Sequence, residues 1–351
     1  MVDTLTTRTF RESLNRTGSS TPLPDTSKPD KFDAAATTIA VLIPCYNEEA
    51  SIAAVVRDFN EALPEAVIYV YDNNSRDRTV EVARAAGAIV RTEPLQGKGN
   101  VVRRMFADVD ADIYVLVDGD DTYHAPSARR MVDKLVSENL DMVNGARVTD
   151  IVAAYRPGHR FGNMMLTGLV AGIFGKRTAD MLSGYRIFSR RFVKSFPALS
   201  GGFEIETELT VHALELRMPL AEIETPYKDR PEGSVSKLRT YHDGVRILKL
   251  ILVLVKEERP LQFFSSLSAF LVLVSLVLAW PILITFMHTG LVPRLPTALL
   301  STSCMLLAFL SLACGLILET VTRGRREFKR MRYLAIPAPG NVRRELDLPE
   351  G

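Results

Sequence analysis

The sequence predicts an α/β fold built on a mostly parallel sheet, followed by a C-terminal hairpin of two transmembrane helices. Between residues 37 and 237, short apolar runs alternate with amphipathic stretches, as strands alternate with helices in such folds. Polar clusters follow three of the apolar runs. Two runs near the C-terminus, 260–293 and 295–318, contain no Asp, Glu, Lys or Arg. The polar clusters predict a ligand site at the strand ends, and the charge-free runs predict membrane spans.

The elements of the predicted sheet follow from two periodicities. Short apolar runs with polar neighbours predict buried parallel strands at 39–44, 67–71, 88–91, 113–117 and 142–146. Amphipathic stretches between them predict helices at 49–63, 77–86, 99–107 and 128–138. Asp77 begins the second helix as a candidate N-cap. This alternation predicts a sheet that is covered by helices on both faces.

Composition excludes several classes of function. The net charge of the 351 residues is +2 at pH 7, so nucleic-acid binding has no global electrostatic support. The three cysteines and five histidines show no metal-ligand spacing, and the sequence has neither a Walker lysine motif nor G-x-G-x-x-G. Residues 1–36 are rich in Ser, Thr, Pro and Asp and lack the apolar core of a signal peptide. We expect this segment to be a disordered tail.

The charge-free runs predict transmembrane helices at 263–287 and 295–318, within a membrane region of 260–319. Pro281 lies inside the first helix, where neighbouring groups in lipid tolerate a kink. The residues at 290–294 form a short, turn-like link. The alternative is a pair of buried helices in a soluble core, although two adjacent charge-free runs are unusual in a soluble domain.

Basic residues flank this hairpin unevenly. The segment 238–259 combines apolar residues with Arg and Lys and predicts an amphipathic juxtamembrane helix, with a helix packed on the globular domain as the alternative. The segment 320–351 is a basic tail. The link between the spans contains one basic residue, Arg294. Because basic loops stay cytoplasmic, we expect both termini and the preceding domain to face the cytosol.

Three polar clusters end predicted strands: P-C-Y-N-E at 44–48, D-N-N-S at 72–75 and D-G-D at 118–120. Two carboxylates at the mouth of a buried strand repel each other and lose solvation, and a divalent cation removes both costs. Hard oxygen ligands suit Mg²⁺ or Mn²⁺, and Mg²⁺ usually shares its shell with phosphates. The D-G-D cluster therefore predicts a metal-bound diphosphate ligand.

These clusters, with S-G-Y-R at 183–186 and an R…S-K loop at 230–237, resemble the motifs of family 2 glycosyltransferases. The resemblance is closer to the polyprenyl-phosphate glycosyltransferases, a group that includes dolichyl-phosphate mannose synthase and bacterial glucosyl-carrier synthases. It covers about residue 37 to the hairpin and makes 37–237 the catalytic domain. It implies a GT-A nucleotide-sugar-binding fold, a UDP- or GDP-sugar donor, Mg²⁺ or Mn²⁺, and polyprenyl (undecaprenyl or dolichyl) phosphate as the acceptor.

The resemblance also implies roles for single residues. Asp120 would bind the metal, with Asp118 toward the ribose or the metal. At Thr122 some relatives carry Gln, so the third protein ligand stays open. Arg147 and Arg186 would bind the acceptor phosphate, because guanidinium forks match phosphate oxygens. The residues implied to bind the nucleotide sugar are Pro44, Tyr46, Glu48, Asp72, Asn73, Lys98, Arg230 and Lys237.

The implied reaction needs no general base, because a phosphate monoester carries about −1.5 to −2 charges at pH 7. We expect positioning and electrostatic stabilisation of the diphosphate to drive an inverting transfer of one hexose-type sugar. Glu204 and Glu206 are candidate walls of the site. The alternatives are a processive polysaccharide synthase and a non-enzymatic, membrane-anchored scaffold that binds nucleotide sugars. Processive synthases usually carry Q-x-x-R-W, which this chain lacks because Trp280, its one tryptophan, lies in a predicted span. Because two transmembrane helices anchor a protein only weakly in a membrane, a homo-oligomer is plausible.

Overall fold

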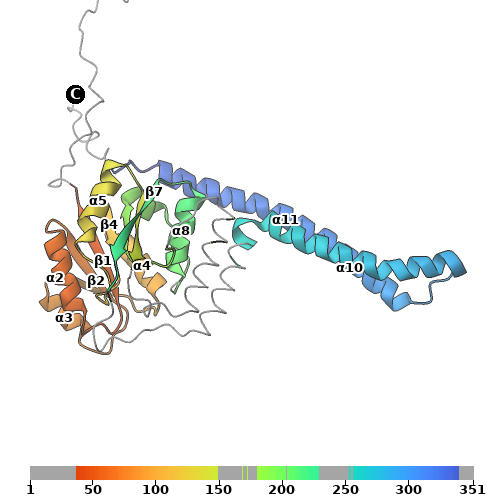
Figure 1. The fold of residues 1–351 in the computed structure, drawn as a ribbon, viewed down its shortest axis with the longest axis horizontal. Coiled ribbons are helices and arrows are strands. Elements are labelled where there is room, and N and C mark those ends of the chain that lie inside the picture. The colour runs from red at the N-terminus through yellow and green to blue at the C-terminus, as the bar shows by residue number, and fades with distance from the viewer. Residues whose placement is uncertain are drawn as a thin grey trace, which may run out of the picture. The chain divides into compact units, whose positions relative to one another are not determined.

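The structure is a computed structural model, and it describes residues 37–148, 168, 172, 180–202, 204–228, 253 and 256–339. Within these residues seven strands form one sheet that helices cover (Figure 1). The strands are β1 (Ile39–Cys45), β2 (Val67–Asp72), β3 (Ile89–Thr92), β4 (Ile113–Leu116), β5 (Met142–Val148), β6 (Arg186–Ser189) and β7 (Leu220–Pro226). The helices of this domain are α2 (Ile52–Ala62), α3 (Thr79–Ala85), α4 (Lys98–Asp108), α5 (Ser127–Ser137), α7 (Arg190–Ser195) and α8 (Ile205–Glu215).

The strands lie in the order β3-β2-β1-β4-β6-β5-β7. Strand β6 is antiparallel to both of its neighbours, β4 and β5, and the other described pairs are parallel. The predicted mostly parallel sheet is therefore confirmed. The sequence analysis did not predict β6, because this strand has four residues and begins with the buried Arg186 rather than with an apolar run.

Two clusters of buried side chains cover the two faces of the sheet. On one face, Val41 and Ile43 of β1 pack with residues of α2 and α5. On the other face, Ala40 and Leu42 of β1 pack with residues of α4, α7 and α8. Successive side chains of a strand point to opposite faces, so a strand buried on both faces must be apolar throughout. This explains why β1 appears in the sequence as one continuous apolar run.

The helix starts differ from the predicted ones for a local reason. Helix α2 begins at Ile52 rather than residue 49, and α3 begins at Thr79 rather than Asp77. Glu49 and Asp77 are instead in the loops, where Oε2 of Glu49 accepts from the Arg78 amide at 3.0 Å and Oδ1 of Asp77 accepts from the Thr79 amide at 3.1 Å. Both acidic side chains accept hydrogen bonds from backbone amides at the start of α3, as a capping residue does.

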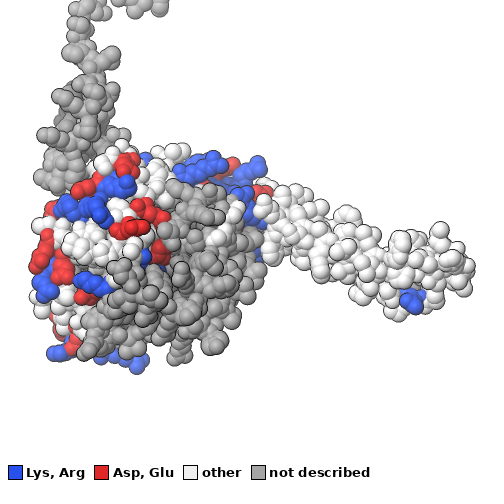
Figure 2. Space-filling model, in the orientation of Figure 1, with Lys and Arg blue, Asp and Glu red and all other residues white. Residues whose placement is uncertain are grey.

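Two further helices, α10 (Pro260–Thr289) and α11 (Leu295–Leu334), lie side by side as a hairpin (Figure 1). Both are long and apolar enough to cross a membrane, and in their most apolar stretches only 11% and 17% of the residues are buried. Such exposure is not that of buried core helices. Figure 2 shows a nearly uncharged surface over the part of the hairpin away from the sheet domain, and charged residues gathered near the domain. Gly290 ends α10 at φ +67°, a left-handed angle that glycine adopts without strain.

Helix α11 continues to Leu334 instead of ending near residue 319, where the basic tail was expected to begin. Its last turns contact the sheet domain: the Tyr333 hydroxyl donates to Asp141 Oδ2 at 2.8 Å, and Lys329 Nζ lies 2.6 Å from Glu215 Oε2. The predicted tail at 1–36 and most of segment 238–259 lie outside the described residues.

Candidate active site

The ends of β1, β2 and β4 bring the three predicted polar clusters together. Cys45 of β1 is in register with Asp72 of β2, and Leu42 with Leu116 of β4. The Ser51 hydroxyl, after the first cluster, donates to the carbonyl of Gly119 at 2.7 Å. Parallel strands leave their carboxyl ends at one edge, so clusters that are far apart in sequence meet there.

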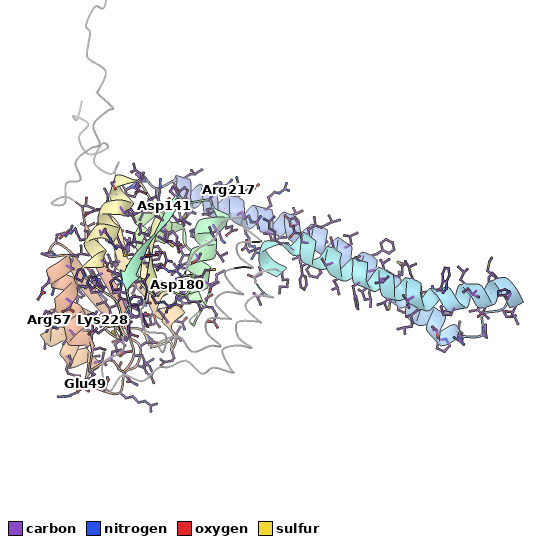
Figure 3. All side chains as sticks on the ribbon, viewed as in Figure 1. Glu49, Arg57, Asp141, Asp180, Arg217 and Lys228 are labelled. Atoms are coloured by element: carbon purple, nitrogen blue, oxygen red, sulfur yellow. The ribbon has the colours of Figure 1, made fainter. Side chains whose placement is uncertain are left out.

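Asp120 is 4% exposed, and its carboxylate is held by the residue two positions later. The Thr122 hydroxyl donates to Asp120 Oδ1 at 2.6 Å. Asp121, between them, has φ +54°, a left-handed angle that Asp and Asn adopt more readily than most residues. This turn folds the Thr122 hydroxyl back onto Asp120. Lys228, labelled in Figure 3, lies 3.6 Å from Asp121 Oδ1 and pairs with the same turn.

Asp118 packs against Gly184, and the next residue, Gly119, packs against Cys45. A Cβ atom at Gly184 would lie 2.3 Å from Asp118 Oδ2, and a Cβ at Gly119 would lie 2.7 Å from Cys45 Sγ. Both distances are far below van der Waals contact. The Gly184 amide also donates to the Tyr123 hydroxyl at 2.8 Å. The S-G-Y-R and D-G-D motifs therefore pack against each other in a way that only glycine permits.

Lys98, the first residue of α4, lies between two acids. Its Nζ is 2.5 Å from Asp118 Oδ1 and 2.6 Å from Glu206 Oε1. The Lys98 side chain is 8% exposed and that of Glu206 10%. Burial alone would lower the pKa of Lys98, but the charges of Asp118 and Glu206 raise it above its usual value. The ammonium therefore stays charged inside the site.

Arg147, at the end of β5, is fixed by a bidentate pair with Asp180, which Figure 3 labels. Its Nε and Nη2 donate to the two carboxylate oxygens at 2.6 Å and 2.9 Å. The guanidinium also lies over the Tyr227 ring, 5.5 Å from its centroid. Burial would raise the pKa of Asp180, but the hydrogen bonds from Arg147 lower it, so the carboxylate remains charged. The Arg147 side chain is 20% exposed.

Arg186 lies inside the protein, and this position does not support the expected contact with an acceptor phosphate. It is 0% exposed. Its guanidinium donates to the carbonyls of Ser183 and Met181, at 2.9 Å and 2.6 Å, and to the Thr210 hydroxyl at 2.8 Å. We correct the expectation accordingly: Arg186 joins the S-G-Y-R turn to α8, and its donors are used in that role.

The first two clusters supply the remaining described candidates. The side-chain Nδ2 of Asn73 donates to the carbonyls of Glu93 and Leu95 at 2.9 Å and 2.8 Å. Its Oδ1 accepts from the backbone amide of Gly97 at 2.7 Å. Asn73 therefore orders the loop that leads to Lys98 rather than facing outward. The other candidates of these clusters lie along β1, at the end of β2 and in the loop after β1: Pro44, Tyr46, Glu48 and Asp72. Arg230 and Lys237 lie outside the described residues.

The donor set at the strand ends fits a hard divalent cation. Asp118 and Asp120 supply carboxylate oxygens, and Thr122 supplies a hydroxyl that is hydrogen-bonded to Asp120. In the part of the chain that the structure describes, no group of three or more His, Cys, Asp or Glu side chains could complete a metal site. Mg²⁺ is commonly held by one or two carboxylates together with phosphate oxygens, and Asp118 and Asp120 offer the two carboxylates of such a shell.

Sequence reasoning missed two partners in this site. It named Glu206 as a candidate for the wall of the site but not as the partner of Lys98. The sequence did contain one indication of such a pairing, which is an acid at the start of the largely buried helix α8. It did not name Asp180. No pattern around Asp180 marks it, because its pairing with Arg147 joins residues 33 positions apart.

Comparisons with known proteins show which family this chain resembles in sequence. The profile of "Glycosyl transferase family 2" matches residues 40–196. "Glycosyltransferase AglJ" of Haloferax volcanii is 36% identical over 234 residues, which are 65% of this chain and 75% of that protein. "Dolichyl-phosphate hexose transferase" of the same organism is 28% identical over 221 residues, 63% of this chain and 95% of that protein.

Among solved structures, one similar fold is glucosyl-3-phosphoglycerate synthase from Mycobacterium tuberculosis, in complex with Mn²⁺, UDP and glucosyl-3-phosphoglycerate. The TM-score is 0.51 at 24% sequence identity, and the match covers 63% of this chain and 80% of that chain. Similarity at this level shows that the two proteins share the architecture of the sheet domain.

Proposed function

Since the chain belongs to glycosyltransferase family 2, we propose that it transfers one hexose-type sugar from a UDP- or GDP-sugar to polyprenyl phosphate, with inversion. The observation that carries this proposal is the pair Asp118 and Asp120 at the strand ends, in a chain that also has two helices apolar enough to cross a membrane. The name of the 28% identical relative, a dolichyl-phosphate hexose transferase, supports the class of acceptor.

The donor would bind at the edge formed by β1, β2 and β4. Asp118 and Asp120 are the proposed ligands of Mg²⁺ or Mn²⁺, and Thr122 fixes the orientation of Asp120. Bound there, the cation would neutralise charge that develops on the departing diphosphate. Lys98 adds a second positive charge beside Asp118, where it would help to neutralise a diphosphate that the cation binds. The Mn²⁺ and UDP in the mycobacterial neighbour support this donor class.

The nucleophile of the proposed reaction would be an oxygen atom of the acceptor phosphate. This oxygen is ionised at neutral pH, so the protein has to orient it and offset the repulsion between two anions. Arg147 remains our candidate for this role, because Asp180 fixes its guanidinium while 20% of the side chain is exposed. We propose that Arg230 and Lys237, which lie outside the described residues, also bind the donor diphosphate.

The hairpin would hold the enzyme at the membrane that contains the acceptor lipid. Basic residues are numerous in the last third of α11, after its apolar stretch, and Arg294 is the single basic residue of the link. By the positive-inside rule, we place the catalytic domain and both termini on the cytosolic side. The proposed reaction therefore takes place at the cytosolic membrane face.

The test is transfer from radiolabelled UDP- and GDP-sugars to undecaprenyl and dolichyl phosphate by the purified full chain. In Asp120→Asn we expect a loss of roughly 100-fold or more, because one charged ligand of the metal is removed. The matched control is Asp121→Asn, which alters the neighbouring acid and keeps a residue that tolerates the left-handed angle. Undiminished lipid-linked product in Asp120→Asn, or full activity after exhaustive chelation, would overturn the metal assignment. Products longer than one sugar would indicate a polymerising synthase instead.

A further inference from the structure

Glu206 is a buried acid that the proposed reaction does not use directly. It lies in the first turn of α8, and its Oε1 is 2.6 Å from Lys98 Nζ. On its other side, Lys98 Nζ is 2.5 Å from Asp118 Oδ1. The ammonium is thus bridged between one acid at the proposed metal site and one acid behind it. Among the residues that the structure describes, these two carboxylates are the acceptors of the Lys98 ammonium, which carries three N–H groups.

The fold brings the loops that carry Lys98 and Glu206 into unusually close contact. A Cβ atom at Gly99 would lie 2.0 Å from the carbonyl oxygen of Ser200, and one at Gly97 would lie 2.2 Å from that of Gly201. Gly97 also has φ +130°, which side chains rarely allow. These glycines let the start of α4 rest on the loop that precedes α8. Backbone packing therefore holds the start of α4, which carries Lys98, against the loop before α8, which leads to Glu206.

Further hydrogen bonds hold each partner from behind. Asn73 accepts from the Gly97 amide at 2.7 Å, which ties the residue before Lys98 to the end of β2. The Thr210 hydroxyl donates to the carbonyl of Glu206 at 3.3 Å and accepts from Arg186 at 2.8 Å. The buried Arg186 thus supports the first turn of α8. This arrangement fixes both ends of the lysine bridge.

We propose that Glu206 is a positioning residue of the transfer reaction, which holds the Lys98 ammonium beside Asp118 so that this charge meets the donor diphosphate. The inference rests on the proposed function. A lysine side chain is a flexible point charge, so a single partner would leave it mobile. With Glu206 as a second anchor, the ammonium is fixed before the donor binds. Glu206 also shares the ammonium's charge, which leaves Asp118 able to bind a divalent cation.

The experiment measures binding without an acceptor. UDP-glucose and GDP-mannose are titrated into the purified full chain with Mn²⁺ by calorimetry, for wild type, Glu206→Gln, Lys98→Met and the double variant. We expect Glu206→Gln to weaken donor binding about 10-fold, in keeping with the loss of one hydrogen bond to a charged group. Because Glu206 acts through Lys98, the double variant binds no more weakly than Lys98→Met. Additive losses would overturn the proposal.

The matched control is Glu215→Gln, which changes an acid on the same helix that is also buried and paired with a lysine. Glu215 is 3% exposed in its side chain and lies 2.6 Å from Lys329 Nζ. We expect its thermal stability to fall as in Glu206→Gln while donor affinity stays unchanged. Equal donor affinity in the two variants would overturn the role of Glu206. If Glu206→Gln does not fold, Glu206→Asp is used instead, because it keeps the charge on a shorter side chain. We expect its donor affinity to lie between those of wild type and Lys98→Met. Wild-type affinity in Glu206→Asp would contradict the proposed contact between Glu206 and Lys98.

The outcomes separate this inference from the proposed function. A wild type that binds neither donor overturns both. A wild type that binds a donor but makes no lipid-linked sugar contradicts the proposed acceptor, and the binding data still decide the role of Glu206.

Discussion

Leu42 in the sheet and Leu316 in the hairpin have the same side chain in opposite surroundings. Leu42 is 0% exposed and Leu316 is 55% exposed. Apart from Pro260 at the start of α10, the buried residues of the two helices are small or polar: Ser268, Ser275, Ser301, Ala308, Ser311, Gly315 and Thr322. In water, burial of apolar surface drives folding, whereas lipid offers apolar side chains a solvent as good as a core. The comparison teaches that the sheet domain buries its leucines as a core formed in water does, whereas the hairpin exposes them as helices that could cross a membrane would.

The largest expected difference comes from the same substitution in both regions. Leu42→Ala removes buried atoms from a packed core and should lower the free energy of unfolding by about 2–5 kcal/mol. Leu316→Ala removes atoms that face outward, so we expect almost no change in detergent. The measurement is the midpoint of thermal unfolding by circular dichroism at a fixed detergent concentration. Equal losses at the two positions would mean that the hairpin is part of a water-excluded core.

A second prediction tests how strictly the sheet domain excludes water. His212 packs between Phe192 and Phe196, and burial lowers its pKa from 6.5 to about 3. The folded protein therefore holds a neutral imidazole. The stability that this group contributes is complete above the unfolded pKa and declines as the pH falls toward the folded one. Between pH 7.5 and 5.5 the loss is about 1.4 kcal/mol, since one pKa unit corresponds to that free energy.

The measurement is the pH dependence of unfolding in wild type and in His212→Gln, which cannot titrate. We expect the difference in stability between the two proteins to change by that amount over this interval. Parallel pH profiles would show that His212 is already exposed to water in the folded state.

The smallest expected effect lies inside the hairpin. The Ser275 and Ser301 hydroxyls each donate to the other residue's carbonyl, at 2.8 Å and 2.9 Å. Ser301→Ala should cost about 0.6 kcal/mol, the average for such hydrogen bonds between membrane helices. The control is Ser303→Ala, because the Ser303 hydroxyl donates to Leu299 of its own helix. The thermal midpoints of both variants decide the comparison, and a loss as large as that of Leu42→Ala would refute it.

Much of this fold could be predicted because the strands β1, β2 and β4 are continuous apolar runs that end in polar clusters. Local pattern did not predict β6, where the buried Arg186 interrupts the apolar signal and the pairing partners are distant in sequence. The Lys98–Glu206 ion pair was not predicted for the same reason, because its two residues lie 108 positions apart in the sequence. The D-G-D cluster was predictable because its residues are adjacent. The role of Arg186 was not, because a motif names a residue but not the direction of its side chain.

The turn at Asp121 has a consequence for which sequences can keep this site. Its left-handed backbone brings Thr122 onto Asp120, so the orientation of a proposed metal ligand depends on a main-chain torsion one residue away. Gly, Asn and Asp adopt that torsion more readily than most residues, and a β-branched side chain would oppose it. A substitution at position 121 can therefore keep every proposed metal ligand in the sequence and still misorient Asp120.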